Sequence, residues 1–528
     1  MIVPLTPLDF KRRAVRLYGA KIGVIDGDRR FTYAEFGSRC SRLANALLSI
    51  GLREGDRVAY LAYNSYPLLE AYYGVLEAGG VLAPLNIRLI SAELVAILHS
   101  SGARFLFADP DFLAVVEDIE AASTTPLRVV WLGKPPAGRT EPEYDALLAR
   151  SSDATVLDGV EDENAVAELF FTSGTTGSPR GVMLTHRNLY LHALGVLVSF
   201  GGVEADVQLH TIPLFHVNGW GTPQSLTAVG GTHVMMRKFD PGEALRLIQA
   251  EGVTRFYAGP TMVNAMINHP DIANFDISSL EKVILGGAPA PPDLVRRSEE
   301  VLRCHVESGY GLSETSPVIS HASPKSRLSN ESEQARVARA ASTGLPVLGA
   351  DVRVVDETGQ EVAWDGEQIG EIVVRGNTVM AGYWNDLEGT AAGIRRGWLH
   401  TGDMATVDSE GYILIVDRKK DIIISGGENI ASIEIENVLF QHPAVLEVAV
   451  VAVPDDRWGE APKAIVSLRS GGTASEAELM EFCRSRLSSF KVPKSIDFLD
   501  ALPKGGTGKI LKRDLREPFW EGKARRVH

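Results

Sequence analysis

The sequence predicts an α/β protein with a large N-terminal domain of layered, mainly parallel sheets and helices, which includes a small β-rich subdomain, followed by a small α+β domain. Three observations lead to this prediction. Strand-like and helix-like segments alternate through the first half, short alternating apolar runs begin near Gly349, and a separate helix and strand pattern follows Lys420. At 528 residues the chain is too long for a single core.

The first expected helix begins after Thr32, because Thr32 and Glu35 have the spacing of a capping box. It should end before Gly51, since glycine commonly terminates helices. Three leucines recur on one face of this helix and are expected to be buried: Leu43, Leu47 and Leu48.

The next segments are expected to alternate regularly between strand and helix. They are a strand at 57–64, a helix at 67–77 ended by Gly79 and Gly80, a strand at 81–84, a helix that begins at Ser91, and a strand at 104–108. This order predicts a mainly parallel sheet, whose ligands bind beyond the C-terminal ends of the strands. A later apolar strand, which ends at Phe171, leads into a polar loop in this way.

The second half of the chain is expected to contain two smaller units. In the β-rich subdomain, at about 345–417, we expect strands at 352–355 and 371–375 and turns at Gly359, Gly366 and Gly370. In the α+β unit we expect a helix at 432–442, strands at 447–453 and 463–468, and a helix at 474–487. The boundaries that follow are an N-terminal domain at 1–417, a connection at 418–420 and a C-terminal domain at 421–528.

The composition is that of an ordinary globular protein, with 45% hydrophobic and 23% charged residues. A formal net charge of -14 argues against nucleic acid or an anionic membrane as the main partner. The cysteines Cys40, Cys304 and Cys483 form no C-x-x-C pair, so neither a disulfide framework nor a thiolate metal site is indicated. We expect a cytoplasmic protein with no signal peptide, membrane span or peroxisomal address.

The segment that follows Phe171 concentrates hydroxyl groups, glycines and one cation. Glycine lets backbone N–H groups approach an anion, hydroxyl groups donate hydrogen bonds, and arginine adds a positive charge. The residues expected to bind a polyphosphate are Thr172, Ser173, Gly174, Thr175, Thr176, Gly177 and Arg180. A polar loop without a ligand is the structural alternative, whereas a P-loop is excluded by the residues after Gly177.

Five further segments accompany this loop in a set order along the chain. They are Pro-Leu-Phe-His at 213–216, Tyr-Gly-Leu-Ser-Glu-Thr at 310–315, Trp-Leu-His-Thr-Gly-Asp at 398–403, the run at 417–429, and the run at 502–513 that contains Gly-Gly-Thr-Gly-Lys. By these motifs the chain is identified as a member of the acyl-activating (AMP-forming) acyl-CoA synthetases, which are adenylate-forming enzymes. The resemblance extends from about Leu17 to Arg513. The segments 215–220, 376–383 and 425–430 resemble the branch that acts on short- and medium-chain or related carboxylic acids.

The resemblance implies two half-reactions. A carboxylic acid reacts with ATP, with Mg²⁺ present, to give acyl-AMP and pyrophosphate, and coenzyme A then takes the acyl group and releases AMP. Two alternatives remain open: transfer of the acyl group to a separate carrier protein, and an inactive nucleotide-binding homologue. Luciferase-like oxygenation of the adenylate shares the same motifs. A homodimer is the expectation at the level of the family.

The resemblance also assigns roles in nucleotide binding. Glu314 is expected to bind magnesium, because a carboxylate is a hard oxygen ligand, although an acid at a helix start is the structural alternative. Asp403 and Arg418 are expected to bind ribose and phosphate oxygens. The residues expected around the adenine and the phosphates are Gly287, Ala288, Pro289, Tyr310, Gly311 and Ser313. A buried structural tyrosine is the alternative for Tyr310.

Lys509 is expected to contact the carboxylate and the α-phosphate during adenylation, with an ordinary lysine pKa. The family carries its domain hinge where this chain has Lys420, and the resemblance implies a mobile C-terminal domain that rotates between the two half-reactions. That rotation is expected to bring the coenzyme A site to the cleft. The residues expected there are Ser425, Gly426, Gly427 and Asn429.

The acyl group is expected to lie against the segment that begins at His216, which we also count among the catalytic candidates. A satisfied core histidine is the alternative at this position. The residues expected to line the acyl pocket are His216, Val217, Trp220, Gly286 and Gly311. One departure concerns Arg180, where the family commonly has lysine. Because arginine keeps the charge with another shape, we expect altered loop closure without loss of activity.

Overall fold

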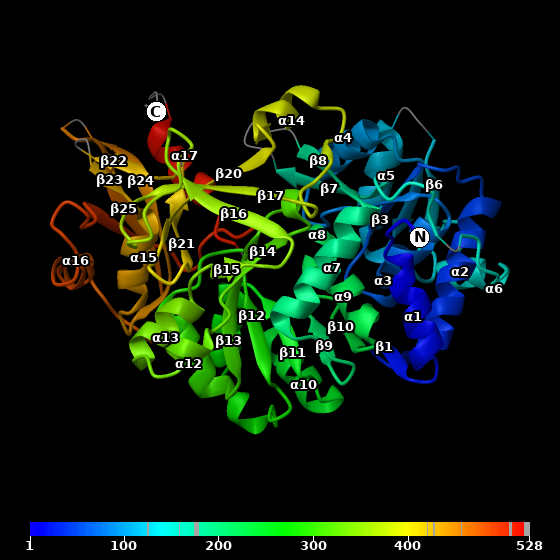
Figure 1. Cartoon of the computed structure of the whole chain (residues 1–528), viewed down its shortest axis with the longest axis horizontal. Coiled ribbons are helices and arrows are strands. Elements are labelled where there is room, and N and C mark those ends of the chain that lie inside the picture. Colours follow the sequence, from blue (N-terminus) through cyan, green and yellow to red (C-terminus); the bar gives the residue numbers. More distant parts are fainter. Residues whose placement is uncertain are drawn as a thin grey trace.

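The computed structural model describes residues 1–123, 126–157, 159–173, 179–419, 421–425, 428–455, 457–505 and 509–521, apart from the side chains of Ser173 and Asn429. The N-terminal elements lie at the right of Figure 1 and the C-terminal elements at the left, with the strands of the longest sheet between them.

A seven-stranded sheet contains the strands predicted in the first part of the chain. Its order is β18-β8-β7-β4-β3-β5-β6, with parallel pairing from β7 to β6 and antiparallel pairing of β7 with β8 and of β8 with β18. The strands are β3 (Arg57–Leu61), β4 (Val81–Pro84), β5 (Phe105–Ala108), β6 (Arg128–Trp131), β7 (Val166–Ser173), β8 (Pro179–Thr185) and β18 (Gly382–Tyr383). The predicted parallel arrangement is therefore confirmed, and β7 leads into the polar loop.

A nine-stranded sheet lies beside it, in the order β15-β14-β13-β12-β11-β9-β10-β1-β2. The six strands from β13 to β1 are parallel, and the two ends of the sheet are antiparallel. The strands are β1 (Ile22–Asp26), β2 (Arg29–Thr32), β9 (Val207–His210), β10 (Thr232–Met235), β11 (Arg255–Ala258), β12 (Lys282–Leu285), β13 (His305–Gly311), β14 (Val318–His321) and β15 (Leu345–Pro346).

Helices cover and separate these sheets. They are α1 (Leu8–Tyr18), α2 (Tyr33–Ser49), α3 (Tyr66–Glu77), α4 (Ser91–Ser101), α5 (Leu113–Ala122), α6 (Tyr144–Ala149), α7 (His186–Phe200), α8 (Val217–Trp220), α9 (Thr222–Val229), α10 (Pro241–Glu251), α11 (Pro260–Ile267), α12 (Pro292–Leu302) and α13 (Glu333–Ala340). The capping box of Thr32 and Glu35 is confirmed at the start of α2. Leu43 and Leu47 are fully buried, but the prediction for Leu48 is wrong, because it is 40% exposed in the last turn of α2.

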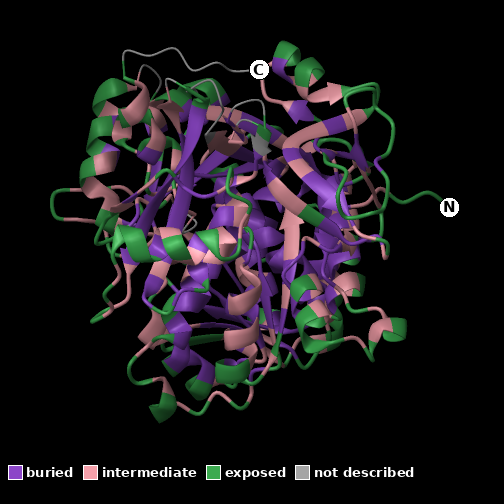
Figure 2. Ribbon diagram, turned by 90° about the vertical axis from the view of Figure 1, so that its left-hand side faces the viewer, coloured by how far each residue is buried: buried purple, intermediate pink, exposed green. Residues whose placement is uncertain are grey.

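Helix α3 is buried along its whole length. It packs in one core with Tyr60 of β3 and Val24 of β1, so it touches both large sheets. Two acidic side chains of α3 are fully buried and carry cationic partners, Glu70 with Arg39 and Glu77 with Lys11. Figure 2 shows the same distribution over the whole molecule, with buried strands inside and exposed helical faces outside.

The β-rich subdomain contains a five-stranded antiparallel sheet with the order β16-β17-β20-β19, and β21 also pairs with β20. Its elements are β16 (Ala350–Val355), β17 (Gly370–Gly376), β19 (Ile394–Arg395), β20 (Trp398–Val407), β21 (Ile413–Arg418) and helix α14 (Leu387–Gly393). Gly359 and Gly366 have the positive φ expected of turns. Gly370 is instead the first residue of β17, where a Cβ atom would lie 2.5 Å from the Val355 carbonyl oxygen.

The C-terminal elements form a separate sheet with the order β23-β22-β25-β24, and β26 pairs with β25. They are β22 (Ile423–Ser425), β23 (Glu428–Ile430), β24 (Val445–Asp455), β25 (Gly459–Leu468), β26 (Ser495–Phe498), α15 (Ser432–Phe440), α16 (Glu476–Arg484) and α17 (Lys512–Trp520). The predicted fold class is confirmed. The predicted domain boundaries stay predictions, and Lys420 lies outside the described residues.

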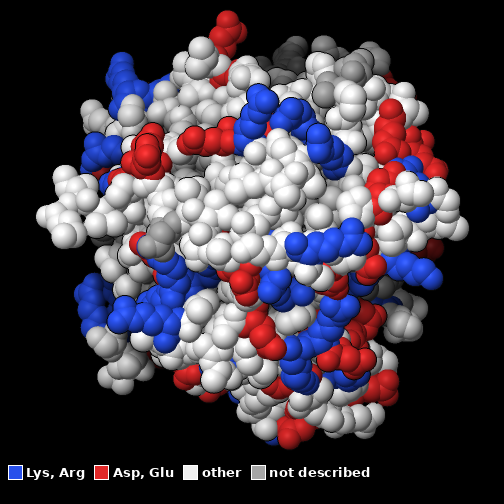
Figure 3. Space-filling model, turned by 90° about the vertical axis from the view of Figure 1, so that its right-hand side faces the viewer, with Lys and Arg blue, Asp and Glu red and all other residues white. Residues whose placement is uncertain are grey.

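The surface carries charges of both signs. On the face shown in Figure 3, lysine and arginine side chains are interspersed with aspartate and glutamate, so this face presents no field of a single sign. No helix in the described part of the chain is both long enough and apolar enough to span a bilayer.

We predict that Lys11→Ala destabilises the protein by about 3–5 kcal/mol, because it leaves the Glu77 carboxylate buried without a cation. Urea unfolding followed by circular dichroism measures the change. Arg12→Ala is the control on the same helix, since Arg12 pairs with Asp9 at the surface and its loss should cost about 1 kcal/mol or less. Equal losses in the two variants would contradict the prediction.

Candidate functional site

The expected polyphosphate loop connects β7 to β8. Thr172 and Arg180 face each other across this hairpin, and the Arg180 guanidinium lies over the Tyr383 ring at 5.3 Å. The Arg180 Nε atom is also 3.5 Å from an Asp386 carboxylate oxygen. Residues Gly174, Thr175, Thr176 and Gly177 lie outside the described part, as does the Ser173 side chain. The role of this loop stays a prediction.

Glu314 lies in the short 3₁₀ helix Ser313–Thr315 after β13. The Tyr383 hydroxyl donates to Glu314 Oε1 at 2.8 Å. Tyr383 therefore contacts both Glu314 and Arg180, and it connects two predicted site residues that are far apart in the sequence. Sequence reasoning gave Tyr383 no role, although the tyrosine follows a glycine-rich segment that the resemblance had singled out.

Asp403 forms the centre of a three-residue cluster. Tyr310 donates its hydroxyl to Asp403 Oδ2 at 2.6 Å, and Arg418 Nε lies 3.2 Å from Asp403 Oδ1. Asp403 is 4% exposed, and Arg418 is its partner in the β20–β21 register. Burial and the Asp403 charge raise the pKa of Tyr310 well above its usual value, so its hydroxyl stays a donor. The structure thus brings together three residues predicted to bind the nucleoside.

The segment Gly286–Pro289 follows the C-terminal end of β12, at the edge where ligands of parallel sheets bind. Its two glycines lie against the Trp220 indole ring: a Cβ atom on Gly286 would be 2.8 Å from Trp220 Cη2. The structure therefore brings Trp220 and Gly286 together, as the predicted acyl pocket requires. Ala288 and Pro289 lie at the surface end of the segment.

Gly311 has a structural reason to be glycine. A Cβ atom there would lie 1.9 Å from the Pro317 carbonyl oxygen, so the close approach of two backbone segments excludes any side chain. Its predicted contacts with nucleotide and acyl group stay predictions. Ser313, one of the other predicted nucleotide contacts, is buried next to Glu314.

Five consecutive residues after His216 have positive φ. The values are 40° for Val217, 42° for Asn218, 53° for Gly219, 64° for Trp220 and 77° for Gly221. Three of the five carry side chains, and such backbone costs on the order of 1–3 kcal/mol for each of these residues. Surrounding contacts must therefore hold the segment in place. Burial lowers the pKa of His216 to about 4, with the Lys509 charge adding to the effect, so its imidazole is neutral.

One such contact comes from Glu168, a fully buried residue of β7. Glu168 accepts hydrogen bonds from Asn218 Nδ2 at 3.3 Å and from Gln224 Nε2 at 2.9 Å. Burial raises the pKa of its carboxyl to about 8, although the two amides oppose the shift. Sequence reasoning missed Glu168, whose signal was a single charged residue within an otherwise apolar strand.

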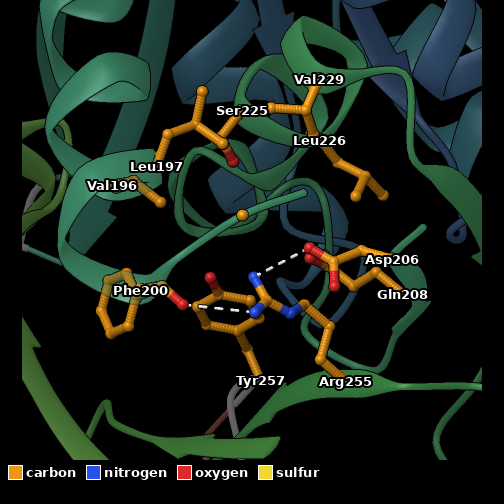
Figure 4. A pocket seen from close by; sticks show the side chains of 11 residues that line it. Val196, Leu197, Phe200, Asp206, Gln208, Ser225, Leu226, Val229, Arg255 and Tyr257 are labelled. Carbon is orange, nitrogen blue, oxygen red and sulfur yellow. Dashed lines mark hydrogen bonds and ion pairs between the residues drawn. The ribbon is translucent and has the colours of Figure 1, made fainter. Parts of the chain in front are cut away.

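Trp220, at the end of this segment, packs against another aromatic ring. Trp220 meets Tyr257 edge to face, with ring centroids 6.2 Å apart. Behind Tyr257, the buried Arg255 guanidinium contacts Asp206 at 3.3 Å and donates to the Phe200 carbonyl oxygen at 3.2 Å (Figure 4). The cavity there has a volume of about 10 Å³, the space of about one water molecule, so it is no ligand pocket. Arg255 instead holds the end of α7 beside Tyr257.

Lys509 lies near Arg418 and Asp403, two of the predicted nucleotide residues, whose charges act on its ammonium. Burial lowers the pKa of its ammonium to about 8, with the Arg418 charge as the next cause, and the Asp403 carboxylate opposes the shift. The expectation of an ordinary lysine pKa is therefore wrong, because the sequence gives no measure of burial. Arg88 donates to the Gly505 carbonyl oxygen at 2.9 Å, so the N-terminal part of the chain contacts the loop that carries Lys509.

The predicted coenzyme A residues lie in the β22–β23 hairpin. Ser425 is buried at the end of β22, opposite Glu428, and the Asn429 backbone pairs with Ile424. Gly426 and Gly427 lie outside the described residues. This role, like the hinge at Lys420, stays a prediction.

Comparison with known proteins defines the class to which this site belongs. The family model described as "AMP-binding enzyme" matches residues 10–384, and the model "AMP-binding enzyme C-terminal domain" matches residues 434–509. The chain belongs to the AMP-binding enzyme family, the adenylate-forming enzymes. It is an ATP-dependent acid–CoA ligase, which forms an acyl-AMP with release of pyrophosphate and transfers the acyl group to coenzyme A.

Its relatives include a feruloyl-CoA synthase of Amycolatopsis sp, 41% identical over 96% of this chain and 98% of that protein. The probable acyl-activating enzyme 6 of Arabidopsis thaliana is 37% identical over 97% of this chain and 96% of that protein. Among solved structures, an anthranilate CoA ligase in complex with anthranoyl-AMP has a TM-score of 0.90, 26% identity and 98% coverage of both chains.

We predict that kcat/KM for adenylation of the acid falls as pH rises through about 8, because Lys509 of the substrate-free enzyme loses the proton that makes it a cation. Above that pH the rate should drop about tenfold for each unit. Acid-dependent ATP–pyrophosphate exchange measures it. In Lys509→Arg the guanidinium stays charged, so the fall should disappear even where the overall rate is lower.

The pH profile is also measured for Glu168→Gln, which removes a second group whose pKa lies near 8. In this variant the exchange rate should still fall as pH rises through about 8. A fall that persists in Lys509→Arg and disappears in Glu168→Gln would contradict the assignment to Lys509.

Proposed function

We propose that the arrangement of the chain in this structure, with Lys509 near Asp403 and Arg418, is the one that performs adenylation. The observation that carries this proposal is the burial of Lys509 within reach of the charges of Asp403 and Arg418, which lie in another part of the chain. An ammonium loses solvation there, and an attacking carboxylate with an α-phosphate would supply the opposite charge that it lacks. The hydrogen bond from Arg88 to Gly505 supports the same arrangement.

Each residue then has a defined part in the reaction. A carboxylate oxygen attacks the α-phosphorus of ATP, and the bond from that phosphorus to the departing pyrophosphate breaks. Lys509 orients the two anions and stabilises the charge that develops between them. Asp403 accepts from ribose hydroxyls, Arg418 donates to ribose or phosphate oxygens, and Tyr310 stacks on the adenine.

The proposed phosphate ligands are those of the β7–β8 hairpin together with Arg180. In the second half-reaction, the sulfur of coenzyme A attacks the acyl carbon, and the bond to AMP breaks. We place the thiol beside Ser425, Gly426, Gly427 and Asn429 after rotation about Lys420.

Glu314 fits a magnesium ion that is shared with the substrate phosphates. Mg²⁺ usually binds proteins through one or two carboxylates, with phosphate and water oxygens as its other ligands. When bound, the ion would neutralise phosphate charge. The Tyr383 hydroxyl orients Glu314 for that contact.

We propose an aromatic carboxylic acid as the substrate. The names of three relatives support this class, the feruloyl-CoA synthase, the anthranilate CoA ligase and a benzoate–CoA ligase of Arabidopsis thaliana. The aromatic rings of Trp220 and Tyr257 in the proposed pocket suit a planar ring. A short branched acid is the second candidate, because Trp220 packs closely on Gly286 and a 2-methylpropanoate–CoA ligase of Humulus lupulus is also a relative.

We predict that ATP–pyrophosphate exchange is strongest with aromatic acids in a panel that also contains short branched and linear acids. Mass detection of the thioester after addition of coenzyme A tests the second half-reaction. Lys509→Ala should lower exchange about 10²–10³-fold with every acid, since it removes one preorganised donor. Unchanged exchange in that variant would refute the role of Lys509, and exchange without thioester would favour a carrier protein.

We also predict that Arg88→Ala lowers exchange about two- to tenfold and leaves thioester formation from supplied acyl-AMP unchanged or faster, because the hydrogen bond to Gly505 stabilises only the adenylation arrangement. Rapid-mixing assays of each half-reaction measure this. Arg104→Ala is the control, since Arg104, directly before β5, pairs with Asp56 at the surface. Equal slowing of both half-reactions would contradict the prediction.

A further inference from the structure

The run Val217–Gly221 requires external support. A β-branched residue rarely has positive φ, and here Val217 is followed by two other such residues with side chains, Asn218 and Trp220. The freedom of glycine to adopt positive φ explains the backbone only at Gly219 and Gly221. Without anchors the run would relax, and Trp220 would leave Gly286.

Glu168 supplies the first anchor through Asn218. The Asn218 side chain accepts a hydrogen bond from the Gly221 backbone N–H and donates one to Glu168 Oε2 at 3.3 Å. Its amide is therefore held in one orientation, with the oxygen toward Gly221 and the nitrogen toward Glu168. Gln224 of α9 donates to the other oxygen of Glu168 at 2.9 Å. One carboxyl group thus connects β7 to the run itself and to helix α9, which follows it.

A second anchor holds the Gly219 carbonyl group. Thr222 donates to that oxygen at 2.8 Å, and its hydroxyl also lies 3.4 Å from His210 Nδ1. His210 in turn contacts His233 at 2.9 Å between ring nitrogens. Burial lowers the pKa of both histidines, so this chain of contacts is uncharged.

We propose that Glu168 is a positioning residue for acyl selectivity, which holds Asn218 and thereby sets the depth at which Trp220 lies in the acyl pocket. This inference rests on the proposed acyl pocket. Glu168 itself belongs to the strand behind the run and contacts the pocket only through Asn218 and Gln224.

The surroundings of Glu168 favour a neutral carboxyl group. Its hydrogen-bond partners among the described residues are the two amides, which are uncharged. Burial raises the pKa of Tyr72 and Tyr73 of α3 well above the usual value, and the charge of an ionised Glu168 would add to that shift. Gln224 Oε1 is buried and has no hydrogen-bond partner among the described residues.

The experiment compares the ratio of kcat/KM for the bulkiest and the smallest acid that the wild-type enzyme activates, by ATP–pyrophosphate exchange. Glu168→Gln keeps the shape but offers one acceptor oxygen where the carboxyl group offers two, so at least one amide loses its partner. The ratio should shift about tenfold toward the bulkier acid, as expected for one lost buried hydrogen bond. The proposed role of Lys509 is the same for both acids, so its effect on kcat/KM cancels in the ratio.

Glu70→Gln is the matched control. Glu70 is equally buried and also accepts from two side chains, Arg39 and Tyr144, but it belongs to α3 and contacts the run through neither of them. Its variant should leave the ratio unchanged. A ratio within twofold of wild type in Glu168→Gln, with rates lowered equally for both acids, would overturn the inference.

Trp220→Ala separates this inference from the pocket on which it rests. If Trp220→Ala leaves the ratio unchanged, the proposed acyl pocket is refuted and the inference fails with it. If Trp220→Ala shifts the ratio and Glu168→Gln does not, only the inference about Glu168 fails. Asn218→Asp serves as a second variant, because it keeps the acceptor for Gly221 but loses the donor to Glu168, and the same shift is expected. Loss of folded protein in both Glu168→Gln and Asn218→Asp would assign the cluster to folding and overturn the proposal.

Discussion

The buried Asp403 carboxylate is the constraint around which the site is arranged. An ionised carboxylate away from water is costly unless cations and donors surround it, and here Arg418 and Tyr310 do so. Tyr310 is the penultimate residue of β13 in the nine-stranded sheet, Asp403 lies in β20 of the β-rich sheet, and Arg418 is the last residue of β21. One charge therefore joins the two sheets at the point where the chain continues toward its C-terminal elements.

The charges of Arg418 and Asp403 also influence the pKa of Lys509. Arg418 and burial favour the neutral amine, whereas Asp403 favours the ammonium, and the balance lowers the pKa of Lys509 to about 8. The ammonium form of Lys509 is thus less stable at this position than in water. The carboxylate of the acid and the α-phosphate of ATP would reverse this preference, because they bring negative charge to the ammonium. Insertion of Lys509 is then coupled to the presence of both substrates, with the surface contact from Arg88 as a weaker support.

Much of the fold could be predicted from the sequence, because capping boxes and apolar strands are local patterns, and the structure places several of the predicted site residues, such as Tyr310, Asp403 and Arg418, in contact. Thr32 and Glu35 define the start of α2 through contacts three residues apart. The failures involve quantities that depend on distant segments. The exposure of Leu48, the pKa of Lys509 and the contact of Tyr383 with Glu314 all follow from packing between elements. Glu168 was missed for the same reason, since its partners lie 50 and 56 residues further along the chain.

Strand β7 connects the two parts of the site that must act together. Thr172, at its end, enters the expected polyphosphate loop, and Glu168, four residues earlier, holds the run that carries Trp220. Glu168 also pairs with Leu82 of the neighbouring strand β4, so the core of the sheet keeps its backbone in place. In the proposed site, the groups common to every reaction of the family would bind at the end of the strand. The acyl group, which differs between family members, would bind against a strained segment that β7 supports from behind, so selectivity would change in that segment without moving the proposed ATP ligands.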